Sequence, residues 1–117
     1  MSISGNIEDK RSSDIIERTI FEKKIRIESV ENHFDHGFLL IVLNNGNVIK
    51  ILRSQFPRLK NANQKNLDNF NLIAGGVGVE WPALDEHLSL KGMVESIIRK
   101  NTLDYLTGKD DSEKVLG

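Results

Sequence analysis

Residues that could do chemistry gather between Leu72 and Glu86. Gly75, Gly76 and Gly78 fall within four positions there, and glycine-rich turns can hold a phosphate when they join a strand to a helix N-terminus. The third glycine of the dinucleotide-binding pattern is missing, and the following residues alternate as in a strand. No Gly-Lys-Ser/Thr triplet occurs either. The glycines therefore predict a tight turn with closely packed backbone, and we expect no cofactor.

A group of carboxylates lies beside the only tryptophan, Trp81. Glu80, Asp85 and Glu86 could act as general acid and base, or bind a hard cation such as Mg²⁺. Acidic residues shortly before a helix more often complement the positive end of its dipole or meet a basic partner surface. Because Asp85 and Glu86 come just before the clearest predicted helix, we expect no catalytic residue here.

The three histidines, His33, His36 and His87, could in principle contribute to a zinc site. Their spacing does not support one, since no His-x-x-x-His pattern falls on a predicted helix and the chain has no cysteine. The Gly-x-Ser-x-Gly pattern of serine hydrolases is also absent. We therefore expect surface histidines, no bound metal and no enzymatic activity.

The composition is that of one ordinary globular domain. The chain has 117 residues, a net charge of −1 and no cysteine, which excludes disulfides, thiol catalysis and zinc–thiolate sites. The longest apolar run covers residues 38–43, whereas a membrane-spanning helix takes about 20 residues. The N-terminal residues lack the apolar core of a signal peptide. We therefore expect a cytoplasmic protein without a membrane segment.

The charges are distributed unevenly along the chain. No acidic residue occurs between His36 and Leu67. This stretch carries five cations: Lys50, Arg53, Arg58, Lys60 and Lys65. Such a run predicts either a nucleic-acid-binding surface or, more often, an ordinary solvated surface.

Three predicted strands form an antiparallel meander. Residues 24–31, 38–43 and 48–52 have the apolar content and alternation of strands. Asn45-Gly46 is a strong hairpin signal between the second and third strands. The alternation slips near Ser29, which predicts a β-bulge.

Short helices are expected around this meander. Residues 14–20 predict a helix with Asp14 as its N-cap, in a capping-box pattern. Ser54 would cap a short turn that tolerates Pro57 in its first positions. Asn63 would cap a second short helix.

The last predicted elements are a strand and the clearest helix. Val77, Val79 and Trp81 alternate along a strand, which Pro82 should end because proline has no N–H for a ladder. Ser89 would cap a helix whose apolar residues share one face: Leu90, Met93, Val94, Ile97 and Ile98.

Together these elements predict an α+β fold. A small antiparallel meander with an added strand would pack against short helices and one C-terminal amphipathic helix. We expect an N-terminal extension over residues 1–23, a single domain over 24–99 and a C-terminal tail over 100–117. Because a meander has edge strands, a homodimer is also plausible from the sequence.

Several motifs resemble the bacterial family known as domain of unknown function 2442. They are Ser54–Leu59 (SQFPRL), Val79–Pro82 (VEWP), Leu84–Glu86 (LDE) and Leu88–Met93 (LSLKGM). The motifs occur in the family's order within about residues 24–99.

The resemblance implies a small α+β domain, with a meander on short helices and no assigned reaction. It also implies a bacterial protein often encoded beside another small protein, an arrangement like that of toxin–antitoxin pairs. Some relatives carry an added helix-turn-helix and are described as DNA-binding, and this chain has no room for that addition after Lys100. His87 departs from the acidic residue usual after the Asp-Glu pair, so no metal argument is built on that triplet.

We predict a non-enzymatic protein-interaction module, an antitoxin-like partner of a small neighbouring protein. Arg58, Trp81, Asp85 and Glu86 are the predicted partner-binding residues, because tryptophan and arginine often anchor interfaces. Maintenance of the fold explains the same residues equally well. Two alternatives stay open: a nucleic-acid-binding or regulatory protein using residues 50–65, and a phage or mobile-element inhibitor of a host nuclease.

Overall fold

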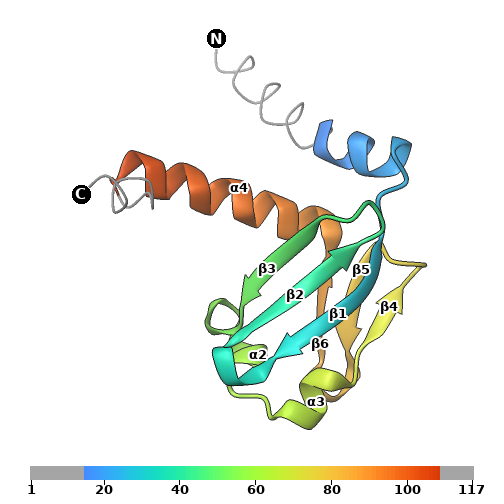
Figure 1. The fold of residues 1–117 in the computed structure, drawn as a ribbon, viewed down its shortest axis with the longest axis vertical. Coiled ribbons are helices and arrows are strands. Elements are labelled where there is room, and N and C mark those ends of the chain that lie inside the picture. The colour runs from blue at the N-terminus through green and yellow to red at the C-terminus, as the bar shows by residue number, and fades with distance from the viewer. Residues whose placement is uncertain (1–14, 109–117) are drawn as a thin grey trace.

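Two small antiparallel sheets and several helices make up residues 15–108, the part of the chain that the computed structural model describes (Figure 1). The first sheet contains β1, β2 and β3, and the second contains β4, β5 and β6, each in sequence order. A long helix, α4, follows β6. The predicted α+β class, with its meander and C-terminal helix, is confirmed.

The first sheet is the predicted meander. Its strands are β1 (Ile27–His33), β2 (Phe38–Leu43) and β3 (Val48–Leu52), with β2 in the middle. Gly46 turns the hairpin between β2 and β3 with a φ of +90°, which glycine adopts without a steric clash. The Asn-Gly signal therefore identified the correct turn.

A bulge in β1 keeps two apolar side chains inside. The register with β2 shifts between Ile27 and Ser29, as the sequence predicted. Ile27 and Val30 would point to opposite faces of a regular strand, being three residues apart. With the extra residue both are buried, at 2% and 9% exposure.

The second sheet contains two strands that the sequence did not predict. Its strands are β4 (Asn71–Ile73), β5 (Gly78–Trp81) and β6 (Glu86–Ser89). The predicted strand corresponds to β5, and both neighbours pair with it antiparallel. β4 and β6 have three and four residues, which is too short for an alternating pattern to stand out.

Two of the predicted helix caps are confirmed. Asn63 caps α3 (Gln64–Asp68), its side-chain oxygen accepting a backbone N–H at 2.8 Å. Ser89 caps α4 (Leu90–Leu106), its hydroxyl oxygen accepting a backbone N–H at 2.9 Å. Each cap pairs one of the N–H groups that a helix start leaves without a partner.

The third predicted cap is wrong. Ser54 lies inside a 3₁₀ turn, Arg53–Gln55, and caps no helix. The following helix, α2 (Pro57–Lys60), begins with its proline as expected. Two further 3₁₀ turns, Phe34–His36 and Pro82–Leu84, follow β1 and β5.

Both ends of the described chain are helical. Residues 15–22 form the expected first helix, whose predicted cap, Asp14, lies outside the described residues. Glu17 on this helix forms an ion pair with Lys91 of α4 at 3.7 Å. At the other end α4 continues into the segment predicted as a tail, and its C-terminal half projects beyond the sheets (Figure 1).

The glycine-rich turn between β4 and β5 joins both sheets and α4. Gly76 has a φ of +115°, and its carbonyl accepts the N–H of Ile27 at 2.8 Å. A Cβ on Gly76 would lie 2.4 Å from the Ile27 carbonyl oxygen. The next carbonyl, that of Val77, accepts the N–H of Leu90 at 2.9 Å. The prediction of a tight turn with close backbone packing is confirmed.

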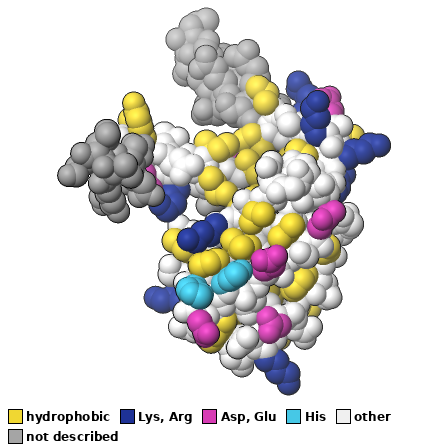
Figure 2. Space-filling view, viewed as in Figure 1, with side chains coloured by type: hydrophobic (Ala, Val, Ile, Leu, Met, Phe, Trp, Pro, Cys, Tyr) yellow, Lys and Arg dark blue, Asp and Glu magenta, His cyan; other side chains and the backbone are white. Residues whose placement is uncertain are grey.

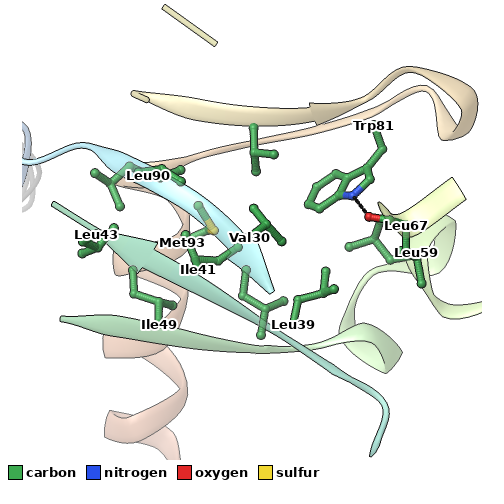
Figure 3. Close-up of a cluster of buried hydrophobic side chains, with 13 residues drawn as sticks. Val30, Leu39, Ile41, Leu43, Ile49, Leu59, Leu67, Trp81, Leu90 and Met93 are labelled. Carbon is green, nitrogen blue, oxygen red and sulfur yellow. Dashed lines mark hydrogen bonds between the residues drawn. The ribbon is translucent and has the colours of Figure 1, made fainter. Parts of the chain in front are cut away.

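The core lies between the two sheets and contains only apolar side chains among the described residues (Figure 3). The largest fully buried ones come from both sheets and all three labelled helices: Trp81, Ile27, Leu39, Ile41, Leu59, Leu67, Leu90 and Val79. A single apolar core is what a domain of this size needs for stability.

Candidate functional site

Trp81 is part of the core and does not lie on a surface. Its side chain is 0% exposed, and its indole N–H donates to the Leu67 carbonyl at 3.1 Å (Figure 3). Burial removes a large apolar ring from water, and the hydrogen bond satisfies its one polar group. The prediction that Trp81 contacts a partner is therefore wrong for this fold, because no partner can reach the ring.

Arg58 and Asp85, two other predicted partner-binding residues, contact each other. The Arg58 Nη1 lies 3.1 Å from Asp85 Oδ2 and also donates to the Asp85 carbonyl oxygen. Asp85 has a left-handed backbone with a φ of +51°, at the turn that leads into β6. The contact links α2 to this turn, and because both side chains are exposed it contributes little to stability.

Glu86 stands beside this pair. Its carboxylate accepts the N–H of His87 at 3.0 Å. The structure thus brings Arg58, Asp85 and Glu86 to one corner of the molecule, while Trp81 points from β5 into the core. Each of these four side chains thus makes a contact within the fold.

One of the five cations of the basic stretch, Arg53, is held by the fold. Its Nη2 donates to the Phe34 carbonyl at 3.1 Å, and its guanidinium carbon lies 4.7 Å from the centre of the Phe34 ring. Its Nη1 also reaches the Lys60 carbonyl at 3.4 Å. Through these contacts Arg53 links the 3₁₀ turn after β1 to the segment after β3.

The other four cations lie on three different elements. Lys50 is on β3, Arg58 and Lys60 are on α2, and Lys65 is on α3. Figure 2 shows several Lys and Arg side chains together at the upper right of one face, and others standing singly over the rest of it. Arg53 and Arg58 make contacts within the fold, so two of the five cations already have protein partners, and nucleic-acid binding by this stretch stays a prediction.

The histidines do not form a metal site. His33 stacks on Phe38 with 4.8 Å between ring centres, and His36 lies 6.0 Å from the same ring. Within residues 15–108 no group of three or more His, Cys, Asp or Glu side chains is placed to hold a metal ion. His87 is on β6, in the other sheet.

The outer face of the first sheet carries an apolar patch. Along β2 and β3 every second side chain is buried, so the intervening ones point away from the core. We call the apolar ones the outer patch: Phe38, Leu40, Val42, Val48 and Leu52. None of them packs against the core cluster, and Val48 and Leu52 are 51% and 37% exposed.

Figure 2 views this face, with the first sheet in front of the second as in Figure 1. Apolar side chains lie across its middle, with His, Asp and Glu side chains beside them. Cross-strand pairing places Glu31 and Lys50 on either side of Leu40. The outer patch therefore has an apolar centre with charged groups at its sides.

A groove lies at the edge of this face, between β3 and α4. Its volume is about 510 Å³. The residues that line it include Val48, Lys50 and Leu52 of β3, and Ser96, Ile97 and Lys100 of α4. Among residues 15–108, no Asp or Glu belongs to its lining. The sequence alone does not predict this groove, because the groove depends on how α4 lies relative to β3.

None of the described helices combines the length and the apolar character that crossing a bilayer requires.

Comparison with known proteins identifies a family. Residues 27–99 match the family described as protein of unknown function (DUF2442). The chain belongs to this family. Among curated proteins none matches it.

Two solved structures resemble the DUF2442 fold of this chain. One is a protein of unknown function from Rhodospirillum rubrum ATCC 11170, with a TM-score of 0.56 and 22% identity, covering 62% of this chain and 87% of that chain. The other is an uncharacterised protein from Chromobacterium violaceum, with a TM-score of 0.58 and 24% identity, covering 72% of this chain and 76% of that chain. Both likenesses concern the fold.

The DUF2442 motifs coincide with residues that hold the fold together. Leu59 and Trp81 are fully buried, Arg58 pairs with Asp85, and Ser89 caps α4. The match ends at residue 99, so the last turns of α4 lie beyond it.

Proposed function

We propose that this protein is a non-enzymatic protein-interaction module that binds a small partner protein through the outer patch. One observation carries the proposal: a partly exposed apolar sheet face whose side chains do not pack against the core. A sheet usually buries one face in the core and exposes a polar face to water. An exposed apolar face is typical of a binding surface.

The outer patch has the anatomy of an interface. Protein interfaces combine an apolar centre with a polar, hydrated rim. Here Leu40 lies between Glu31 and Lys50 across the sheet, and His33 pairs with Phe38. Removing such side chains from water contributes roughly 25 cal/mol for each Å² of apolar area, which favours association.

The partner class follows from the family resemblance. Family members are often encoded beside another small protein, and an antitoxin-like role would be to bind and neutralise that neighbour. The proposal moves the binding surface from Arg58, Trp81, Asp85 and Glu86 to the outer patch. Those four residues are engaged within the fold.

Co-expression with the product of the adjacent gene tests this proposal. A photoreactive benzoylphenylalanine at Val48 should form a covalent adduct with that protein. The same residue at Lys65, an exposed position on α3, is the matched control and should form none. The Val48→Glu variant should fail to co-purify the partner while remaining folded by circular dichroism.

Two results would contradict the proposal. One is equal cross-linking from Val48 and Lys65. The other is a complex that survives Val48→Glu unchanged. An adduct between two copies of this chain, with none to the neighbour, would instead assign the outer patch to a homodimer.

A further inference from the structure

The edge of β3 presents unpaired backbone N–H and C=O groups at every second residue. The Leu43 N–H donates to the Asn47 carbonyl at 2.9 Å, and the Arg53 N–H donates to the Gly37 carbonyl at 3.1 Å. Hydrogen-bonded pairs alternate with non-bonded pairs along an antiparallel ladder. The residues of β3 that bond to β2 are therefore Ile49 and Ile51.

The intervening residues of β3 point their backbone groups the other way. By this alternation, the N–H and C=O groups of Val48, Lys50 and Leu52 point away from β2. Because β3 is the last strand of its sheet, no described strand pairs with these groups. Such an edge is a template for another extended chain. The groove between β3 and α4 lies beside it.

The groove has room for an extended segment. Its volume of about 510 Å³ falls within the range of known ligand sites, roughly 300–1,000 Å³. One wall is β3, and the other includes Ser96 and Ile97 of α4. A strand edge beside a helix is a common site for peptide binding by strand addition.

Lysine on an edge strand usually blocks such pairing, but Lys50 does not stand in the way here. Its Nζ lies 4.5 Å from the centre of the Phe38 ring, which is on the neighbouring strand β2. The ammonium group is therefore drawn over the sheet, by attraction to the ring face, and away from the open edge.

We propose that the partner inserts an extended segment into this groove and pairs with β3 as a fourth strand. The inference rests on the proposed function and specifies how the partner binds. The segment would carry an acidic side chain opposite Lys50, the one cation on β3; Lys100, which also lines the groove, already pairs with Asp104 at 2.7 Å. The residues two positions before and two positions after this acidic residue would be apolar. They would lie opposite Val48 and Leu52 and would extend the outer patch.

A partner segment fits this edge better than a second copy of the chain. In a pairing of β3 with β3, the second copy would bring its own α4 to the same edge, because α4 forms a wall of the groove. A single extended segment needs only the space between β3 and α4. The occupant is therefore a strand supplied by another protein.

A fluorescent peptide of alternating threonine and valine, with a central glutamate between threonines, serves as the probe. It should bind the full chain saturably. N-methylation at the glutamate and at the valines two positions away on either side removes the N–H groups that would face β3. This should weaken binding about fivefold for each hydrogen bond lost, whereas N-methylation of the intervening residues should leave binding unchanged.

The matched protein variants are Lys50→Pro and Lys50→Ala. Both remove the charge, but only proline removes the outward N–H, and proline is tolerated at a strand edge. Lys50→Pro should bind the probe about fivefold more weakly than Lys50→Ala. Amide exchange measured by NMR should show protection of Val48 and Leu52 only when the peptide is bound.

Absence of saturable binding, or equal binding by both N-methylated peptides, would overturn strand addition. The comparison of the two N-methylated peptides tests strand addition even if Lys50→Pro unfolds the sheet. The proposed function is tested separately. A partner that is lost on Val48→Glu but unaffected by Lys50→Pro would support the outer patch as the binding surface and overturn strand addition, whereas a complex that survives Val48→Glu would contradict the proposed function.

Discussion

Trp81 shows how a motif residue can be read as a binding anchor and prove to be a core residue. Its ring is 0% exposed and its N–H pairs with the Leu67 carbonyl. Trp81→Phe keeps an aromatic ring but leaves that carbonyl without its donor, so we expect a loss of about 1–3 kcal/mol in the free energy of unfolding. Urea denaturation measures this loss. Tyr105→Phe, at a side chain 72% exposed, should change stability by less than about 0.5 kcal/mol.

Gly75 and Gly76 are adjacent but should respond differently to substitution. Both have positive φ, +76° and +115°. A Cβ at Gly76 would also meet the Ile27 carbonyl oxygen at 2.4 Å, whereas nothing lies within 4 Å of one at Gly75. Gly75→Ala should cost about 1–2 kcal/mol from backbone strain alone, and Gly76→Ala should cost at least about 1 kcal/mol more.

Thermal and urea unfolding of the two alanine variants check this difference. Equal losses would mean that the turn can move away from β1 without penalty. The junction between the two sheets would then not depend on close backbone contact at Gly76.

At the scale of elements, the start of α4 allows a test of whether substitutions at Ser89 and Gly92 affect stability independently. Ser89→Ala removes the cap and should cost about 1 kcal/mol. Gly92→Ala would gain helix propensity of about 1 kcal/mol, but its Cβ would lie 2.9 Å from the Ser89 hydroxyl oxygen. We therefore expect Gly92→Ala to stabilise the protein only when Ser89 is already alanine.

A double-mutant cycle in urea measures this coupling directly. Additive effects of the two substitutions would show that the Ser89 hydroxyl moves aside without losing its hydrogen bond. The cycle compares four folded proteins, so it does not depend on an absolute stability.

The elements that the sequence predicted are those with local signals. The meander follows from three apolar runs and the Asn45-Gly46 turn, and α4 follows from its apolar stripe and the Ser89 cap. β4 and β6 escaped prediction because pairs such as Leu72 with Val79 are set by neighbours across the sheet. In strands this short the sequence carries too few positions to show alternation.

The candidate site was missed for a related reason. Residues 38–43 are apolar on both faces, and the sequence predicted a strand in the middle of its sheet, which is correct. That pattern does not say whether a second layer covers the other face. Here the second sheet covers only the side of Leu39 and Ile41, so Leu40 and its neighbours remain as the outer patch.

At the scale of the whole molecule, the two faces of the first sheet separate stability from binding. Side chains such as Ile49 point into the core, while Val48 and Leu52 point outward. Ile49→Ala should destabilise the fold by about 2–5 kcal/mol, because it opens a cavity. Val48→Thr with Leu52→Thr should change the free energy of unfolding by less than about 1 kcal/mol, since both positions are partly exposed and threonine suits a strand.

The same double threonine variant should bind the neighbouring small protein at least about tenfold more weakly, because apolar contacts at the centre of an interface carry much of its affinity. Urea denaturation and isothermal titration on one preparation measure stability and affinity together. Unchanged affinity with unchanged stability would remove the outer patch from the interface. Weaker binding accompanied by an equal loss of stability would mean that the outer face serves the fold, as Trp81 does, and that the binding surface lies elsewhere.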